Sequence, residues 1–161
     1  MSTGTITFQE RSGRIESAIP GVYRLHMQKY ARTSLSSVLY AQGSTKLLQE
    51  STTDRTVRIK NAQIWFDEVS ESITEENSAM ECNCVIRIYN GSTPLIITAS
   101  NTAMVANNVI IAKFPEIEYF TLPASYYLEL LVRVEPLKSG ALPTTSDHFI
   151  TNFTCELEYP L

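Results

Sequence analysis

Apolar and polar residues alternate along much of the second half of the chain, which is the pattern of a β-strand with one buried face. In residues 126–135 (YYLELLVRVE), one face carries Tyr126, Leu128, Leu130, Val132 and Val134. In residues 149–159, one face carries Phe149, Phe153, Cys155, Leu157 and Tyr159. Both segments are therefore predicted to be strands, with their apolar faces turned toward the core.

Three further segments have strand-like patterns that include an interruption. Residues 82–99 predict a hairpin, because CNCVIRIY and LIITA flank an Asn90-Gly91 pair that supplies the positive φ angles of a tight turn. In residues 55–69 the apolar phase shifts after Ile59, which predicts a bulge near Lys60 to Ala62 or a strand with both faces covered. Residues 108–122 predict two short strands or one bent strand, since Pro115 cannot donate to a ladder.

The first 54 residues are less regular. Residues 5–8 and 21–27 suit strands. Residues 34–43 place Leu35, Val38 and Leu39 at helical spacing, with Ser34 as a cap and Gly43 as a stop, and this spacing predicts a short helix. We therefore expect an N-terminal arm or irregular segment over residues 1–50 and a β-sandwich domain over residues 51–161.

The number of predicted short strands indicates the fold class. Many short strands without strong helices between them favour an all-β, antiparallel β-sandwich of jelly-roll type. With the irregular N-terminal segment, at most one or two short helices are expected. The length of 161 residues and the 43% hydrophobic content allow one core rather than two domains of ordinary size.

Targeting signals change this picture little. The sequence has no run of about 18 apolar residues, and its first 20 residues contain no apolar signal-peptide core. We therefore expect a protein that neither spans a membrane nor follows the classical secretory route.

Charge is distributed unevenly along the chain, although the formal net charge is only -4. Residues 1–60 hold nine basic and four acidic residues, and the remaining residues hold four basic and thirteen acidic ones. The basic first part and the acidic second part can attract each other within one subunit or between neighbouring copies. The basic residues are scattered singly, so nucleic acid is not expected as a direct partner.

Candidate catalytic groups are few. A serine or cysteine nucleophile needs a base within hydrogen-bond reach, and the chain contains only His26 and His148. Asp147 and His148 are adjacent on a predicted strand, where neighbours point to opposite faces, so they are poorly placed to act as a dyad. The chain is expected not to be an enzyme, and no catalytic or cofactor-binding residues and no cofactor are predicted.

Metal ligands are similarly sparse. Cys82 and Cys84 share a strand face, and Cys155 lies on an apolar face, but a single C-x-C without a second close pair is far from a zinc signature. Buried, reduced thiols are the simpler interpretation. Residues 67–81 (DEVSESITEENSAME) are rich in carboxylates but lack the order and glycine of a calcium loop, so a solvated connection is preferred over a Ca²⁺ site. No metal-binding residues are predicted.

Aromatic residues leave one binding function open. Tyrosine and tryptophan rings can line a sugar-binding face, because they join an apolar body to a polar tip. Trp65 lies between Ile64 and Phe66 in an apolar strand, which favours a place in the core or an interface. Carbohydrate binding remains the alternative interpretation.

The predicted strands resemble small viral or phage structural proteins of the jelly-roll type. The resemblance rests on DRTVRIKNAQIWF at 54–66 and on the closing strands YYLELLVRVEPL and FITNFTCELEYPL. It implies a capsid or virion protein whose N-terminal segment reaches a neighbouring subunit. The chain departs from capsid proteins that package RNA directly, because it has no arginine-rich arm.

The leading hypothesis is a non-enzymatic structural protein that self-assembles, or docks in a viral or phage particle or a similar assembly. Its partners would be copies of itself in a homo-oligomer or other virion proteins, and its location would be the virion, or otherwise the cytoplasm. The basic first part would dock onto acidic parts of neighbours, and removal of residues 1–50 would leave a folded β domain. The alternative is a lectin-like β-sandwich module.

Overall fold

A computed structural model describes residues 2–15, 20–35, 38–69, 80–103, 111–136 and 147–160. Within these ranges every regular element is a strand, and no helix occurs. The strands are β1 (Ser2–Thr5), β2 (Gln9–Ile15), β3 (Val22–Leu35), β4 (Val38–Leu48), β5 (Arg55–Asp67), β6 (Met80–Tyr89), β7 (Leu95–Ala103), β8 (Ala112–Lys113), β9 (Ile117–Leu122), β10 (Tyr127–Pro136) and β11 (Asp147–Pro160).

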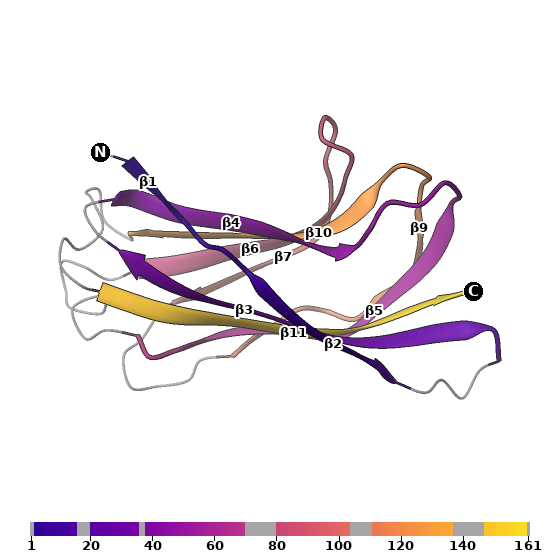
Figure 1. Cartoon of the computed structure of the whole chain (residues 1–161), viewed down its shortest axis with the longest axis horizontal. Coiled ribbons are helices and arrows are strands. Elements are labelled where there is room, and N and C mark those ends of the chain that lie inside the picture. The colour runs from indigo at the N-terminus through magenta and orange to yellow at the C-terminus, as the bar shows by residue number, and fades with distance from the viewer. Residues whose placement is uncertain are drawn as a thin grey trace.

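The strands form two stacked sheets, which Figure 1 shows as an upper and a lower layer. The five-stranded sheet has the order β1-β4-β10-β6-β7. The six-stranded sheet has the order β2-β3-β11-β5-β8, and β9 also pairs with β5. All described pairings are antiparallel except that of β1 with β4, which is parallel.

The strand order is that of a jelly roll. Without β1 and β2, the orders are β4-β10-β6-β7 in one sheet and β3-β11-β5 with β8 and β9 in the other. The first strands of this set, β3, β4, β5 and β6, alternate between the sheets, and so do the last two, β10 and β11. Two interleaved Greek keys produce this arrangement. The all-β sandwich of jelly-roll type expected from the sequence is therefore confirmed.

The core lies between the sheets and contains the residues that the alternation pattern selected. The fully buried side chains of β10 are Leu128, Leu130, Val132 and Val134, and those of β11 include Phe149, Phe153, Cys155 and Leu157. Two aromatic pairs lie in this core with edge-to-face geometry: Phe66 with Phe149 and Phe114 with Phe153, whose ring centroids are 5.9 and 6.1 Å apart. Such pairs add stability beyond the area that they bury.

The predicted bulge in β5 is also confirmed. The register against β11 shifts between Thr154 opposite Gln63 and Glu156 opposite Lys60, and Asn61 has a positive φ of 52°. The extra residue returns Ala62 and Ile64 to the buried face after Val57 and Ile59. The segment around Pro115 forms two short strands, β8 and β9, as expected, while residues 108–110 lie outside the described ranges.

The first 50 residues are not an irregular segment in the described ranges. Strand β3 pairs with β11 along its whole length, from Val22 opposite Pro160 to Leu35 opposite Asp147. The alternation is hidden in the sequence because the inner face of β3 carries Lys29 and Thr33, which are polar but buried. The expected boundary near residue 50 therefore separates no independent sheet, since β3 and β4 are neighbours of β11 and β10.

The short helix predicted over residues 34–43 is wrong. Leu35 ends β3, and Val38–Leu48 forms β4, whose Gly43 lies opposite Val132 of β10. The pairing of β4 with the buried central strand β10 outweighs the local preference for a helix, which is weak because Gln42 interrupts the helical spacing.

The N-terminal segment joins the two sheets along one side, as Figure 1 shows where β1 leaves the upper layer and β2 enters the lower one. Ile6 lies at this crossing, is 2% exposed, and its amide donates to the carbonyl of Gln42 at 2.9 Å. A Cβ atom on Gly43 would overlap the backbone and side chain of Ile6. Glycine at position 43 therefore allows the crossing chain to approach β4 closely.

Candidate interaction surface

The outer face of the six-stranded sheet carries a charge network that joins distant parts of the sequence. Adjacent strands place Glu158 of β11 opposite both Arg24 of β3 and Arg58 of β5. Glu156 accepts a hydrogen bond from Arg24 at 2.9 Å, and Glu158 lies 3.3 Å from the ammonium of Lys60. The glutamate–arginine network consists of Arg24, Arg58, Lys60, Glu116, Glu118, Glu156 and Glu158.

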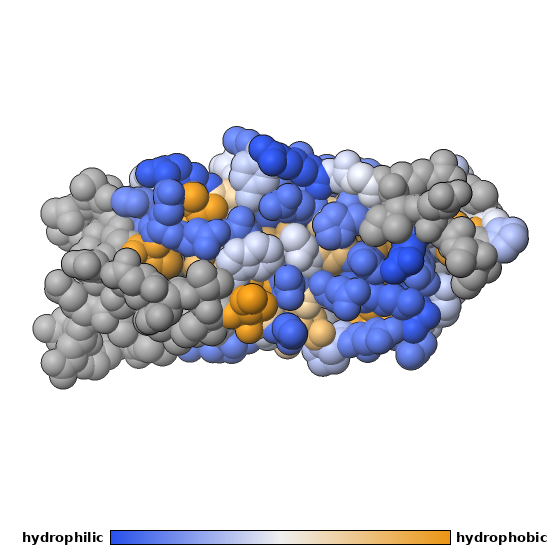
Figure 2. All heavy atoms as spheres, turned by 90° about the horizontal axis from the view of Figure 1, so that it is seen from below, coloured by the Kyte–Doolittle hydropathy of each residue, from blue (hydrophilic) through white to orange (hydrophobic). Residues whose placement is uncertain are grey.

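The members of this network stabilise one another's charges. The hydrogen bond to Glu156 raises the pKa of Arg24, and that to Glu116 raises the pKa of Arg58. The side chain of Glu158 is 8% exposed, and its carboxylate also accepts a hydrogen bond from the Tyr119 hydroxyl at 3.3 Å. In Figure 2, which views the molecule from below, much of the visible surface of this side is hydrophilic.

This network contains three of the nine basic residues of the first part and four of the thirteen acidic residues of the second. Its cations all come from residues 1–60, and its carboxylates all come from the acidic second part. The two parts therefore attract each other within one chain, because β11 lies between β3 and β5. Attraction within one subunit, one of the two possibilities that the charge distribution allowed, is therefore present in the structure. Docking of basic first parts onto acidic parts of neighbours stays a prediction.

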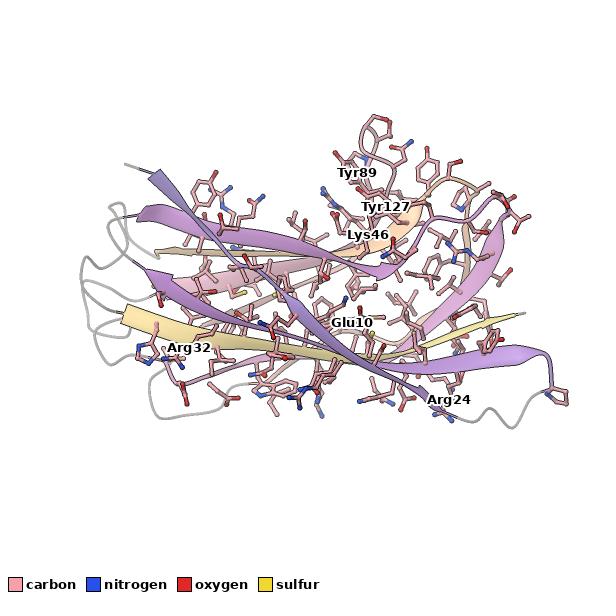
Figure 3. All side chains as sticks on the ribbon, in the orientation of Figure 1. Glu10, Arg24, Arg32, Lys46, Tyr89 and Tyr127 are labelled. Atoms are coloured by element: carbon pink, nitrogen blue, oxygen red, sulfur yellow. The ribbon has the colours of Figure 1, made fainter. Side chains whose placement is uncertain are left out.

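The outer face of the five-stranded sheet carries tyrosines with cations above their rings. Figure 3 shows Tyr89, Tyr127 and Lys46 together above this sheet. The rings of Tyr89 and Tyr127 are 5.7 Å apart at 80°, and the ammonium of Lys46 lies 4.3 Å from the centre of the Tyr127 ring. Arg87 lies 4.2 Å from the Tyr89 ring. Desolvation is the main cause that raises the pKa of Tyr127.

Carboxylates complete this second set of contacts. Arg87 pairs with Glu129 at 2.7 Å, and Glu129 is 6% exposed although it lies on the outer face. Arg133 lies 3.8 Å from the ring centre of Tyr40 and pairs with Glu135 at 3.2 Å. A cation thus already covers one face of each of these three rings, the kind of face on which a sugar would stack.

The candidate catalytic groups do not come together. His26 lies opposite Glu156 and His148 lies opposite Ser34, so eight residues of β3, about 27 Å of strand, separate the two histidines. Cys82, Cys84 and Cys155 are buried free thiols, as expected, and the sulfur atoms of Cys82 and Cys84 are 3.4 Å apart. Burial raises the pKa of Cys155 to about 12 and that of Cys82 well above its ordinary value, which keeps both protonated.

The acidic segment and Trp65 also have defined places. Asp67 accepts a hydrogen bond from Asn152 at 2.8 Å, and Glu68 pairs with Arg32 at 2.9 Å, while residues 70–79 lie outside the described ranges. Among the described residues no cluster of His, Cys, Asp or Glu could hold a metal ion. Trp65 is half-buried in β5, opposite Asn152, and does not belong to the buried core.

The outer edge of β7, here called the β7 edge, differs from both of these faces. β7 ends the five-stranded sheet, and no described strand pairs with its other side. Leu95 and Ile96 are 60% and 62% exposed, which makes them the most exposed large apolar side chains described. No charged residue lies between Arg87 and Lys113. An exposed, uncharged strand edge is a template for pairing with another strand.

The β7 edge has two distinct parts. The register against β6 shifts between Ile86 opposite Thr98 and Arg87 opposite Ile96, so Ile97 is an extra residue that bulges toward the core. From Thr98 to Ala103 the register is regular. The bulge therefore leaves Leu95 and Ile96 at the exposed start of the strand and a regular edge after them.

The turn that precedes β7 is held by its own side chains. The Asn90 carboxamide oxygen accepts hydrogen bonds from the amides of Ser92 and Thr93, both at 2.9 Å, and Gly91 has a φ of +94°. The predicted hairpin is confirmed, but only Gly91 of the Asn-Gly pair has a positive φ, and residues 90–94 join the strands in a longer loop than a tight turn. In Figure 1 the loop between β6 and β7 stands clear of the sheets.

The described parts of the other sheet edges are protected in recognised ways. β2 carries Glu10 and Arg11, and β9 carries Glu118, whose side chain is 82% exposed. β1 has only four residues and β8 only two. Charges and short length are the usual means by which edges avoid pairing with other chains. The sequence already contained this contrast in the uncharged stretch after Arg87, but the pattern alone did not show which strand would lie at an edge.

Comparisons with known proteins found similarity to solved structures only. No family model and no curated protein matches the chain. Among solved structures, it is similar to a chain of Desmodium yellow mottle tymovirus, with a TM-score of 0.37, 14% identity, and coverage of 84% of this chain and 88% of that one.

Two further similar structures also come from viruses. For turnip yellow mosaic virus the TM-score is 0.36 and the identity 11%, covering 99% of this chain and 94% of that one. For the Gx strain of infectious bursal disease virus the TM-score is 0.35 and the identity 10%, covering 94% of this chain and 38% of that one.

The described residues contain no helix that could span a membrane.

Proposed function

We propose that this chain is a non-enzymatic structural protein that self-assembles, or docks in a viral or phage particle or a similar assembly. The observation that carries the proposal is the β7 edge, which exposes Leu95 and Ile96 and contains no charge. Solvent-exposed edges of this kind are costly to keep free, because they invite pairing with other chains. Association with a partner that covers the β7 edge would account for its exposure in the single chain. The virion is the location that this function would imply.

The faces of the sandwich support an interaction at the edge rather than on a face. The glutamate–arginine network on one outer face and the rings of Tyr40, Tyr89 and Tyr127 on the other have partners within the subunit. A partner that docked on either face would have to replace contacts that the chain already makes. At the β7 edge, a partner strand would instead meet backbone groups that no described strand uses.

The direct test is the mass of the full chain in solution, measured by native mass spectrometry and sedimentation over a range of concentrations. We expect species that are multiples of the 18.1 kDa chain and that grow with concentration. The double variant Leu95→Ser/Ile96→Ser should associate less, because it removes the exposed apolar surface. Ile111→Ser, at a residue that is 47% exposed outside β7, is the matched control and should associate normally.

The carbohydrate-binding alternative makes a different prediction. It is favoured by the tyrosines on the outer face of the five-stranded sheet, of which Tyr89 and Tyr127 form a contacting pair. A monomer that binds members of a glycan array, and loses that binding in Tyr127→Ala, would replace the assembly proposal. A chain that remains a monomer at every concentration and binds no partner would contradict the assembly proposal directly.

A further inference from the structure

The chemistry of the β7 edge restricts what can pair with it. A charged strand laid against β7 would lose part of its hydration and would meet no opposite charge on β7, which is uncharged from Leu95 to Ala103. The favoured partner is therefore an uncharged strand that is long enough for a regular ladder. Among the described edges of this chain, only β7 has these properties, because β2 and β9 are charged and β1 and β8 are very short.

We propose that two copies of this chain pair through their β7 strands, antiparallel, with Ser100 opposite Ser100 of the second copy. This inference rests on the proposed function and specifies its partner and geometry. The contact is isologous, because the same surface serves both copies around a two-fold axis. It joins the two five-stranded sheets into one continuous sheet and uses the β7 edge of both subunits.

The register follows from the bulge and from one side-chain contact. Two antiparallel copies of one strand are related by a two-fold axis perpendicular to the sheet. Residues directly opposite each other in such a pair face the same side of the sheet, whereas successive residues along a strand face opposite sides. The residue at the axis must therefore lie opposite the same residue of the second copy. The regular stretch Thr98–Ala103 allows this at Ser100 or at Asn101 with five residues of each strand in register. Asn101 donates to Glu81 at 3.1 Å, so a centre at Asn101 would bring the two Glu81 carboxylates toward each other. Ser100 is therefore the favoured centre.

This register places Ala99 of one copy opposite Asn101 of the other, on the outer face of the sheet. Both residues are exposed, and their neighbours on β6 are Val85 and Asn83 rather than cysteines. Cysteines placed at directly opposite positions of antiparallel strands lie within disulfide range. The native thiols Cys82, Cys84 and Cys155 are buried and do not compete for oxidation.

The test mixes two variants of the full chain, Ala99→Cys and Asn101→Cys, under mild oxidation. We expect the mixed disulfide dimer to be at least about tenfold more abundant than either homodimer, because only the mixed pair brings the thiols into range. Predominant Ala99→Cys homodimers, predominant Asn101→Cys homodimers, or no cross-linking at all would overturn the proposed register.

A second measurement tests the pairing without cysteines. Ala99→Lys places a charge in the centre of the edge, and we expect it to raise the dissociation constant of the dimer at least about tenfold. Ser12→Lys places the same charge on an exposed position of β2 and should leave that constant unchanged. If the chain associates but neither Ala99→Lys nor the cysteine pair behaves as expected, this inference fails and the assembly function stands. If the unmodified chain never associates, both fail.

Discussion

At the scale of single residues, a buried lysine is the most unusual feature of the core side of the six-stranded sheet. Lys29 lies on the inner face of β3 with its side chain 5% exposed, and it pairs with Glu10 of β2 at 3.2 Å. The Glu10 side chain is 45% exposed, so water reaches one end of this pair. Glu10 thus compensates an ammonium group that would otherwise be buried without a partner.

Replacing Glu10 tests that compensation. Glu10→Gln keeps the shape of the side chain but removes the charge, and we expect the free energy of unfolding to fall by about 1–2 kcal/mol, since water and the amide oxygen partly replace the carboxylate. Glu50→Gln, at the exposed pair with Lys46, is the matched control and should change stability by less than about 0.5 kcal/mol. Urea denaturation measures both variants, and equal losses would contradict the special position of Lys29.

The buried thiols predict how stability responds to alkaline pH. Burial raises the pKa of Cys155 from 9.0 to about 12, so the folded state keeps this proton where the unfolded chain releases it. The resulting stabilisation is complete below pH 9 and disappears as the pH rises toward 12, at about 1.4 kcal/mol per pH unit. Cys155→Ala should therefore show a shallower loss of stability between about pH 9 and about pH 11 in urea titrations. Parallel pH profiles of the two proteins would refute this assignment.

At the scale of elements, the structure changes what truncation should do. Removing residues 1–50 deletes β3 and β4, which pair with the central strands β11 and β10. We expect residues 51–161 alone to show no cooperative thermal unfolding, because both central strands lose a neighbour and the core between the sheets is opened to water. Deletion of residues 2–5 is the control: it removes only β1, a four-residue edge, and should preserve a cooperative transition. A cooperative fold in residues 51–161 would restore the division at residue 50.

The same elements show what sequence reasoning can reach. The alternation pattern predicts β10 and β11 with their buried apolar residues, because Thr151 is the one polar residue described as buried between the apolar positions of these two inner faces. The bulge in β5 is visible as a shift of the apolar phase. The sequence predicts the first part of β3, over residues 21–27, but not its continuation to Leu35, because Lys29 and Thr33 interrupt the inner face. β4 was mistaken for a helix, because its strand conformation depends on pairing with β10, which local spacing does not encode.

The β7 edge cannot be identified from the sequence alone, for a related reason. An uncharged stretch becomes an interaction site only if its strand lies at an edge, and edge position is a property of sheet order. The uneven charge along the sequence indicates attraction either within one subunit or between neighbouring copies. The structure places those charges on adjacent strands of one sheet, where Arg24, Glu158 and Lys60 meet.

At the scale of the whole molecule, the response of assembly to salt separates the two ways in which subunits could attract each other. Docking of basic onto acidic surfaces weakens with added salt, because exposed charges are screened over about 10 Å at 0.1 M and about 3 Å at 1 M. The β7 edge holds no charge, so the pairing of two β7 strands does not depend on such screening.

We therefore expect the dissociation constant of the assembled form to change by less than about twofold between about 0.1 M and about 1 M sodium chloride. Sedimentation equilibrium at several salt concentrations measures this directly. Ala99→Lys serves as an internal standard, because the two lysines lie on either side of the axis, each opposite Asn101 of the other copy, and repel each other. Salt should therefore partly restore its association. If salt strongly weakens the association of the unmodified chain, the interface lies on the charged faces of the sandwich. The uncharged β7 edge would then need another explanation.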